Sequence, residues 1–198
     1  VKNLAETIKG IKDVPIIIGN SVATSIPEIL LSKTKVDIAV IGEGDITIVE
    51  LLKALDNGTP LEEVRGIQYK RNGRIVATAA REIIADINAI PMINWELFDI
   101  EHYIDKHRHS IPEPYPLGIE LLRAMPVNTA RGCIYRCGFC YHIFRGQRYR
   151  PRSPKLICSE IKYLKEKYGV NYIFFWDELT LHSRQQCSDF CDQILNES

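Results

Sequence analysis

The sequence predicts an α/β protein. Short apolar runs of strand length alternate with amphipathic helical segments, and the same alternation occurs twice along the chain. Strands that are joined by helices at such short spacings pair in parallel. With 198 residues, of which 45% are hydrophobic, the chain is long enough for one domain or for two small domains with apolar cores.

The first alternation begins with two strands and a short helix. Residues 14–18 are a continuous apolar run, which is the pattern of a strand buried on both faces, and residues 36–41 are expected to form a second buried strand around the apolar run 38–41. Between them, Ser25 and Glu28 have the spacing of a capping box, and Pro27 stands in the first turn. We therefore expect a short helix to begin at this point.

A longer helix and a hairpin follow. The helix is expected to end near Gly58, and residues 64–78 form two alternating runs around Asn72 and Gly73. An Asn-Gly pair between alternating runs predicts a type I′ hairpin. The apolar positions that give the helix its buried face are Ile48, Leu51, Leu52 and Leu55.

Residues 81–125 are expected to form an irregular linker. Four prolines within the segment interrupt any helical or strand periodicity. Its apolar residues, among them Trp95 and Phe98, are too many for free coil, so the linker is expected to pack on a domain. The prolines are Pro91, Pro112, Pro114 and Pro116.

The second alternation covers residues 126–198. A short strand over residues 127–130 leads directly into a cysteine cluster. Ser153 is an expected helix N-cap, and residues 172–176 read as a fully buried strand with Asp177 directly behind it. The positions expected to be buried on the helix that Ser153 caps are Ile157, Ile161, Leu164 and Tyr168.

The chain is expected to be part of a longer protein. Its first residue is Val1 rather than methionine, and this residue enters what reads as the middle of a helix. Two strand–helix units cannot close a barrel, since a closed barrel takes about 250 residues. We therefore expect the last units to be the beginning of a larger α/β domain.

The six cysteines all follow residue 132. Cys133, Cys137 and Cys140 stand within eight positions, and we call them the cysteine triplet. Such clustering does not suit a disulfide framework and favours metal binding in a reducing compartment. Three thiolates can each hold one iron of a [4Fe–4S] cluster and leave the fourth iron open. The alternative is a zinc site that is completed by His142 or a distant residue.

The other three cysteines have simpler explanations. Cys187 and Cys191 are expected on the apolar face of a final helix, where a free cysteine behaves as a small hydrophobic residue. Cys158 falls on the preceding helix and is explained in the same way. We therefore expect none of these three thiols to be a metal ligand.

Residues 126–198 resemble the radical S-adenosylmethionine (SAM) superfamily. The resemblance rests on the spacing of the cysteine triplet, on the preceding Arg-Gly pair and on Phe139 before the last cysteine. It implies a [4Fe–4S] cluster on the triplet, SAM on the open iron and Phe139 near the adenine. It also implies that Asp177 and Glu178 bind the SAM amino group, although Trp-Asp-Glu stands here in place of the usual Gly-Gly-Glu.

Residues 1–80 resemble the C-terminal half of the B12-binding domain that is fused to many radical SAM enzymes. The resemblance is carried by residues 17–28 and 37–45, and it implies cobalamin as a further cofactor. The cobalt-binding signature of that family lies earlier than this chain, so His107 and His109 are expected to be exposed linker residues. The positions implied to contact cobalamin are Gly19, Asn20, Thr24 and Gly42.

These resemblances together imply a specific architecture and activity. The architecture is a partial Rossmann-like, cobalamin-binding-type domain, a linker and the first two βα units of a TIM-like partial barrel. The activity is reductive cleavage of SAM to a 5′-deoxyadenosyl radical, which starts a methylation or a cyclisation. A one-electron donor such as flavodoxin or ferredoxin is the implied partner, whereas the substrate and the catalytic residues stay unidentified.

Three alternatives stay open. A radical SAM methylthiotransferase would need cluster ligands in its N-terminal domain, and residues 1–132 contain no cysteine. A non-catalytic zinc or iron–sulfur module would use the same triplet without SAM. The isolated chain is in any case expected to be inactive, because the later barrel strands of the implied architecture are absent from it.

The charge composition argues against several partners. Twenty-five basic residues balance twenty-five acidic ones, which gives no general attraction to nucleic acid or to an anionic membrane. No apolar run has the roughly 18 residues of a membrane span, and no signal peptide is visible, so a cytoplasmic location is expected.

One stretch of the chain is basic throughout. Residues 131–155 contain seven basic residues and no acidic one. They form either an electropositive rim for SAM, an anionic substrate or the electron donor, or solvated and paired loop charges. These residues are Arg131, Arg136, Arg145, Arg148, Arg150, Arg152 and Lys155.

Overall fold

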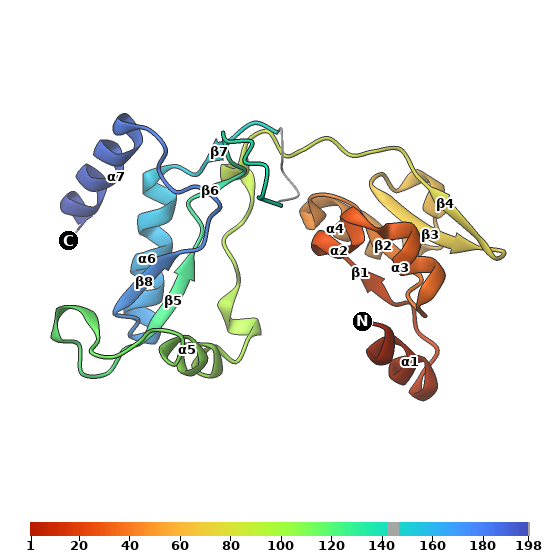
Figure 1. The fold of residues 1–198 in the computed structure, drawn as a ribbon, viewed down its shortest axis with the longest axis horizontal. Helices are drawn as coiled ribbons and strands as arrows, with labels where there is room; N and C mark the ends of the chain where they lie inside the picture. The colour runs from red at the N-terminus through yellow and green to blue at the C-terminus, as the bar shows by residue number, and fades with distance from the viewer. Residues whose placement is uncertain (142–146, 198) are drawn as a thin grey trace. The chain divides into compact units, whose positions relative to one another are not determined.

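The computed structural model describes residues 1–141 and 147–197, and the chain divides into two compact units (Figure 1). Within the described ranges, unit 1 comprises residues 1–84 and 139–141, and unit 2 comprises residues 85–138 and 147–197. Each unit contains a parallel strand pair, so the predicted α/β class is confirmed.

Unit 1 is a four-stranded sheet with helices on both faces. Strand β1 pairs with β2 in parallel, and β2, β3 and β4 follow in antiparallel order. Its elements are α1 (Lys2–Ile11), β1 (Ile17–Ile18), α2 (Asn20–Ser25), α3 (Pro27–Lys33), β2 (Ile38–Val40), α4 (Gly44–Asn57), the short 3-10 helix η1 (Leu61–Glu63), β3 (Ile67–Arg71) and β4 (Arg74–Ala77).

Successive side chains of β2 contribute to two different hydrophobic cores of unit 1, one on each face of the sheet. Ala39 packs with residues of α1, α2 and α3, whereas Ile38 and Val40 pack with α4 and β3. Because successive side chains of a strand point to opposite faces, a continuous apolar run is needed when both faces are covered. The predicted hairpin is confirmed, since Asn72 and Gly73 both have positive φ angles between β3 and β4.

Two sequence predictions in unit 1 were wrong. The helix α3 begins after Ile26 without a side-chain cap, and the Ser25 hydroxyl instead bonds to the carbonyl of Ser21 at the end of α2. The buried stripe of α4 is Thr47, Leu51 and Ala54, so Leu52 is 54% exposed.

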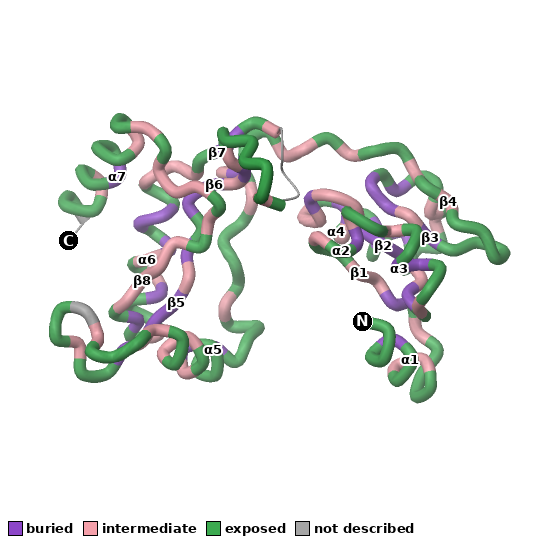
Figure 2. Tube along the Cα trace, viewed as in Figure 1, coloured by how far each residue is buried: buried purple, intermediate pink, exposed green. Residues whose placement is uncertain are grey.

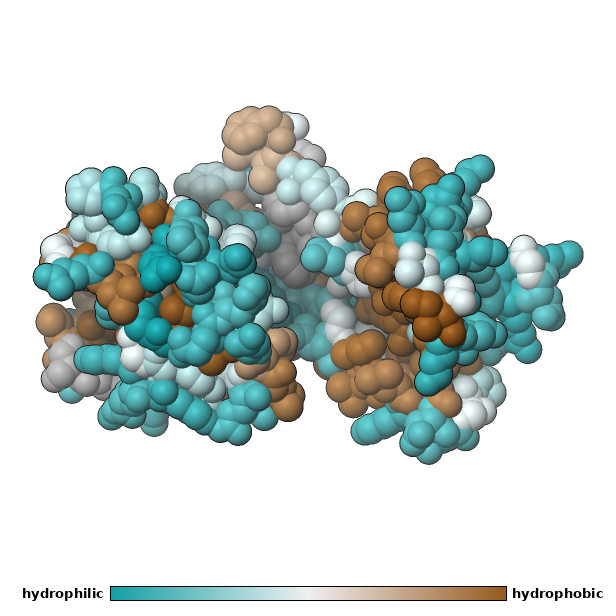
Figure 3. All heavy atoms as spheres, turned by 90° about the horizontal axis from the view of Figure 1, so that it is seen from below, coloured by the Kyte–Doolittle hydropathy of each residue, from teal (hydrophilic) through white to brown (hydrophobic). Residues whose placement is uncertain are grey.

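The outer face of α4 is therefore apolar and open to solvent. Leu52, Leu55 and Val49 belong to this exposed face. Apolar side chains also gather on the side of unit 1 that is seen in Figure 3. The sequence pattern does not distinguish the two faces of α4, because both carry apolar residues and only the neighbours decide which one is buried.

Glycine is required where α4 ends. Gly58 has a φ of +70°, and nothing lies within 4 Å of an added Cβ, so only backbone strain opposes a side chain there. We expect Gly58→Ala to destabilise unit 1 by about 1 kcal/mol. The matched change Gly10→Ala, in α1 without a positive φ, should stabilise by about 0.5 kcal/mol. Hydrogen exchange of the α4 and β2 amides measures both effects, and equal effects of the two changes would contradict the prediction.

Unit 2 is built around the parallel pair β5–β8. Met125 and Val127 of β5 share a core with Ile157 and Leu164 of α6, which buries one face of the pair. Figure 2 shows buried stretches along both β5 and α6. The elements are the 3-10 helices η2 (Ile87–Ala89), η3 (Trp95–Leu97) and η4 (Pro116–Gly118), the helices α5 (Ile100–Arg108), α6 (Pro154–Tyr168) and α7 (Arg184–Glu197), and the strands β5 (Ala124–Val127), β6 (Ala130–Arg131), β7 (Arg150–Pro151) and β8 (Tyr172–Phe175).

The helix α6 follows its sequence prediction closely. The Ser153 hydroxyl accepts a hydrogen bond from the amide of Leu156, and Gly169 ends the helix with a φ of +64°. The predicted stripe is half-buried or buried at every position, and Ile157 and Leu164 are fully enclosed. Cys158 is buried in the same core, as its simpler explanation requires.

Other predictions in unit 2 were wrong. The linker is not irregular throughout, since α5 occupies nine of its residues with Asp99 as N-cap. Strand β8 is only half-buried, because by alternation Phe174 points away from α6 toward a face that is open at Trp176, which is 65% exposed. Cys187 and Cys191 are exposed, whereas Phe190 between them is buried.

Within the part of the chain that the structure describes, no helix has the length and apolar character needed to cross a membrane.

Candidate functional site

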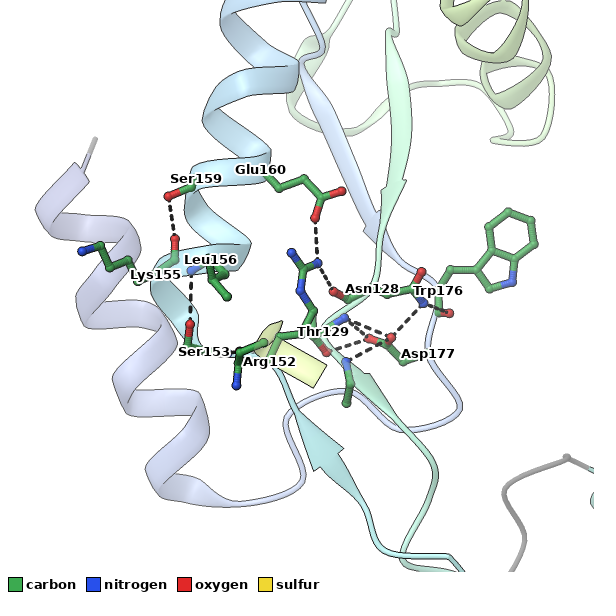
Figure 4. Close-up of polar contacts among 12 residues, drawn as sticks. Asn128, Thr129, Arg152, Ser153, Lys155, Leu156, Ser159, Glu160, Trp176 and Asp177 are labelled. Carbon is green, nitrogen blue, oxygen red and sulfur yellow. Dashed lines mark hydrogen bonds and ion pairs between the residues drawn. The ribbon is translucent and has the colours of Figure 1, made fainter. Parts of the chain in front are cut away.

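The carboxyl ends of β5 and β8 meet at one edge of their parallel pair. Asp177 follows β8, and its carboxylate accepts hydrogen bonds from the backbone amide of Thr129, at 3.0 Å to each oxygen, and from the Thr129 hydroxyl at 2.6 Å (Figure 4). The Asn128 side chain and the Thr180 hydroxyl donate to it as well, at 3.0 and 3.1 Å. Asp177 is thus fully engaged by its own chain.

The positively charged side chain of Arg152 and its backbone amide bind Asn128 and Thr129 on the side opposite Asp177. The Arg152 guanidinium donates to the Asn128 carbonyl at 2.8 Å and to the Glu160 carboxylate at 2.6 Å (Figure 4). The Arg152 amide donates to the Thr129 carbonyl at 2.8 Å. Because the Glu160 side chain is only 5% exposed, this ion pair belongs to the interior of unit 2.

The cysteine triplet follows directly. Cys133 and Cys140 are half-buried, Cys137 is exposed, and none of these thiols is in a disulfide. The Tyr135 amide lies 3.5 Å from the Cys133 sulfur as a donor. Among residues 1–141 and 147–197, no three His, Cys, Asp or Glu side chains are arranged to hold a metal ion. The three thiols are therefore free of disulfides and at least partly accessible.

The residues expected to bind SAM are placed differently from one another. Phe139 is 95% exposed. Glu178 is exposed and, among the described residues, makes no hydrogen bond or ion pair, in contrast to Asp177. It lines a cavity of about 450 Å³ together with Asn128 and Trp176. The linker supplies further walls of this cavity, including Met92 and Trp95.

A second cavity, of about 580 Å³, borders the first cysteine of the triplet. Cys133, Arg136, Tyr149 and His182 are among its lining residues. The Tyr149 ring lies 4.5 Å from the His182 ring, centroid to centroid. Burial, and next the Asp177 charge, raise the pKa of Tyr149 above the usual tyrosine value, so the phenol is neutral at physiological pH.

Sequence reasoning missed the residues that support this edge. Tyr149, Thr129 and Glu160 carry no motif, and Arg152 was named only as one charge of the basic stretch. Thr129 contacts Asp177 from 48 residues away, and Arg152 pairs with Glu160 from eight residues away. One local signal was available: Asn128 and Thr129 are hydrogen-bonding residues placed directly behind a strand. Such a pair at a strand end indicates that the chain needs side-chain partners there.

The parallel pair of unit 1 brings together the positions expected to contact cobalamin. Gly19 and Asn20 follow β1, and Gly42 follows β2. The Gly42 amide donates to the Thr24 hydroxyl at 2.9 Å, and both Asn20 and Gly42 have positive φ angles. The four predicted positions therefore lie at one edge of the sheet, where α/β folds bind ligands.

One of the two linker histidines differs from its prediction. His107 is half-buried on α5, with its ring 5.3 Å from that of Phe174 and 6.2 Å from that of Trp176. It packs inside unit 2 because the linker forms a helix at this point. His109 is exposed, as predicted. His142, the proposed zinc ligand, lies outside the described residues.

Three of the seven residues of the basic stretch are tied into the fold. Arg150 is 3% exposed, Arg152 is paired with Glu160, and Arg131 has a partner of its own. Arg136 and Arg148 are exposed, and Arg145 lies outside the described residues. The sequence left two interpretations of this stretch, an electropositive rim or paired loop charges. Arg131, Arg150 and Arg152 fit the second interpretation.

The curated proteins that the chain resembles include a methyltransferase and a cyclase. The chain is 28% identical over 199 residues to an uncharacterized methyltransferase of Pyrococcus horikoshii, covering 100% of this chain and 40% of that protein. It is 31% identical over 163 residues to the anaerobic magnesium-protoporphyrin IX monomethyl ester cyclase of Cereibacter sphaeroides, covering 81% and 24%. No family model matches the chain.

Solved structures agree in fold. The radical SAM methyltransferase TsrM of Kitasatospora setae superposes with a TM-score of 0.73 at 17% identity, covering 98% of this chain and 35% of that one. The cobalamin-dependent SAM radical enzyme OxsB gives 0.69 at 23% identity, covering 98% and 26%. The chain therefore spans well under half the length of the proteins it matches, and the predicted fold is confirmed.

Proposed function

We propose that the chain is the cluster-carrying part of a cobalamin-binding radical SAM enzyme, because its relatives include a methyltransferase and a cyclase and its fold matches that of TsrM and OxsB. In this proposal a [4Fe–4S] cluster on the cysteine triplet cleaves SAM reductively and starts a methylation or a cyclisation. The observation that carries the proposal is the triplet itself, placed directly behind a strand whose end is fixed to its parallel neighbour.

The residues present fit such a cluster. Cys133, Cys137 and Cys140 supply three thiols that are free of disulfides and at least partly accessible, on a loop short enough for one cluster. When bound, the reduced cluster would supply the electron for SAM cleavage. The chain's own part is to hold three irons, to leave the fourth open and to give the cluster loop a fixed starting point.

Glu178 is the carboxylate that we propose for the SAM amino group. Unlike Asp177, it is not engaged within the described residues, and it lines the cavity beside Trp176. A carboxylate that faces a cavity can form a charge-assisted hydrogen bond with an ammonium group. Phe139, fully accessible before the last cysteine, is proposed to lie against the adenine.

The edge of the sheet in unit 1 is proposed to contact cobalamin. Gly19, Asn20, Thr24 and Gly42 supply backbone groups and one hydroxyl at a single sheet edge. Since the relatives include both methyltransferases and a cyclase, the reaction outcome stays open. We further propose a flavodoxin or ferredoxin as electron donor, with the cytoplasm as the location of the protein.

Electron paramagnetic resonance (EPR) tests this function. The chain would be reconstituted anaerobically with iron and sulfide, reduced with dithionite and recorded with and without SAM. A [4Fe–4S]⁺ signal that changes on addition of SAM is the expected result. Zinc in place of iron, with no iron signal, would overturn the proposal and favour a zinc module.

We expect Glu178→Gln to weaken SAM binding about tenfold, since the charge-assisted part of the contact to the ammonium is lost. The matched control is Glu166→Gln, because Glu166 is an exposed carboxylate on α6. Titration of the EPR change with SAM measures both variants. Equal SAM affinity in the two variants would remove Glu178 from the site.

A further inference from the structure

The chain leaves β5 with backbone groups that no strand satisfies. Strand β5 ends at Val127 and pairs only with β8, which itself ends at Phe175. Thr129, two residues later, is 1% exposed, so its amide and carbonyl are out of contact with water. Buried backbone groups need partners, and here these are the side chains of Asp177 and Arg152 together with the backbone amide of Arg152.

Asp177 and Arg152 supply those partners with opposite charges. Asp177 takes the donors, namely the amide and hydroxyl of Thr129 and, more distantly, the Ala130 amide at 3.4 Å. Arg152 takes the acceptors, because its guanidinium and its amide donate to the carbonyls of Asn128 and Thr129 (Figure 4). Charge-assisted bonds of this kind are shorter and stronger than neutral ones.

The segment held in this way leads straight to the first cysteine. Ala130 and Arg131 form β6, which pairs with β7 just ahead of Arg152, and Cys133 follows two residues later. The anchoring of the segment therefore fixes where the cysteine loop begins and in which direction it leaves the sheet. Such an anchor limits the conformations that are open to the loop, which lowers the conformational entropy that must be lost when a cluster forms.

We propose that Asp177 is a positioning residue for the iron–sulfur cluster rather than a SAM ligand, and that it acts on the cysteine loop through Thr129. The proposal rests on the proposed function, because it requires that the triplet binds a cluster. Arg152, backed by the buried Glu160, holds the same segment from the opposite side. The hydrogen-bond donors to the Asp177 carboxylate that are named above are all groups of the chain itself.

The test is the loss of iron from the reconstituted chain to a chelator, followed by visible absorbance, for Asp177→Asn. We expect iron to leave at least about tenfold faster than in the unsubstituted chain, in line with other changes beside metal ligands. Asp189→Asn is the matched control, since among the described residues the side chain of Asp189 accepts a hydrogen bond from Gln185, on its own helix, and from no other side chain. This control should lose iron at the unsubstituted rate.

A milder variant separates positioning from folding. Thr129→Val keeps the shape of the side chain and removes one donor to Asp177, so iron loss should accelerate in the same direction but by less. The EPR line shape of the bound cluster should also broaden in both variants, which reduced stability of the folded chain alone would not cause. If Asp177→Asn does not fold, Thr129→Val carries the test by itself.

The possible outcomes separate the two proposals. An unchanged rate of iron loss and an unchanged line shape in both variants would overturn the positioning role. A variant at Asp177 that keeps its cluster but no longer responds to SAM would make Asp177 a SAM ligand instead. Failure of the proposed function is visible earlier, because the unsubstituted chain would then form no iron–sulfur cluster.

Discussion

Replacing Cys137 by serine is expected to abolish the iron–sulfur signal of the reconstituted chain almost completely. A hydroxyl is a poor substitute for a thiolate ligand of iron, and a cluster held by three residues has no spare ligand to lose. The same loss is expected for Cys133→Ser and Cys140→Ser. Iron and sulfide content, measured together with the EPR signal, gives the result.

The chain carries its own control for this experiment. Cys187 is exposed, as Cys137 is, but it lies on α7, where its thiol donates to the Leu181 carbonyl at 3.5 Å. Cys187→Ser should therefore retain the full cluster. If Cys187→Ser lost as much iron as Cys137→Ser, the cluster would not be bound where the motif predicts. Retention of the cluster in Cys137→Ser would contradict the assignment directly.

The sequence predicted local structure correctly where a short pattern of residues is compatible with a single backbone conformation. The cap at Ser153 and the turn at Asn72 and Gly73 each depend on a few neighbouring residues, and the structure contains both. The buried face of α4 was misjudged because apolar residues occupy both sides of that helix. In such a case the packing of distant elements decides, and a single segment does not contain that information.

The candidate site divides in the same way. The cysteine triplet is a local motif and was recognisable, whereas Asp177, behind β8, was assigned to SAM only through the family resemblance. Asp177 contacts Thr129, which lies 48 positions earlier in the sequence. Only the parallel register of β5 and β8 brings them together, and this register follows from the fold rather than from the spacing of residues along the chain.

The core of unit 2 gives the second large effect. Leu164 is fully buried in α6, so Leu164→Ala should lower the free energy of unfolding by about 3 kcal/mol through lost burial and the cavity that remains. Leu156→Ala makes the same chemical change on the same helix, at a position that is 38% exposed. It should cost less than about 1 kcal/mol. The comparison isolates burial from helix propensity.

Denaturation by urea, followed by tryptophan fluorescence, measures this difference in the right part of the chain. Both tryptophans of the sequence, Trp95 and Trp176, lie in unit 2, and Trp95 packs directly against the core that contains Leu164. Unfolding of unit 1 is therefore silent in this signal. Equal midpoints for Leu164→Ala and Leu156→Ala would mean that α6 is not the inner wall of unit 2. The end of β5 would then have no rigid support from which to position the cysteine loop.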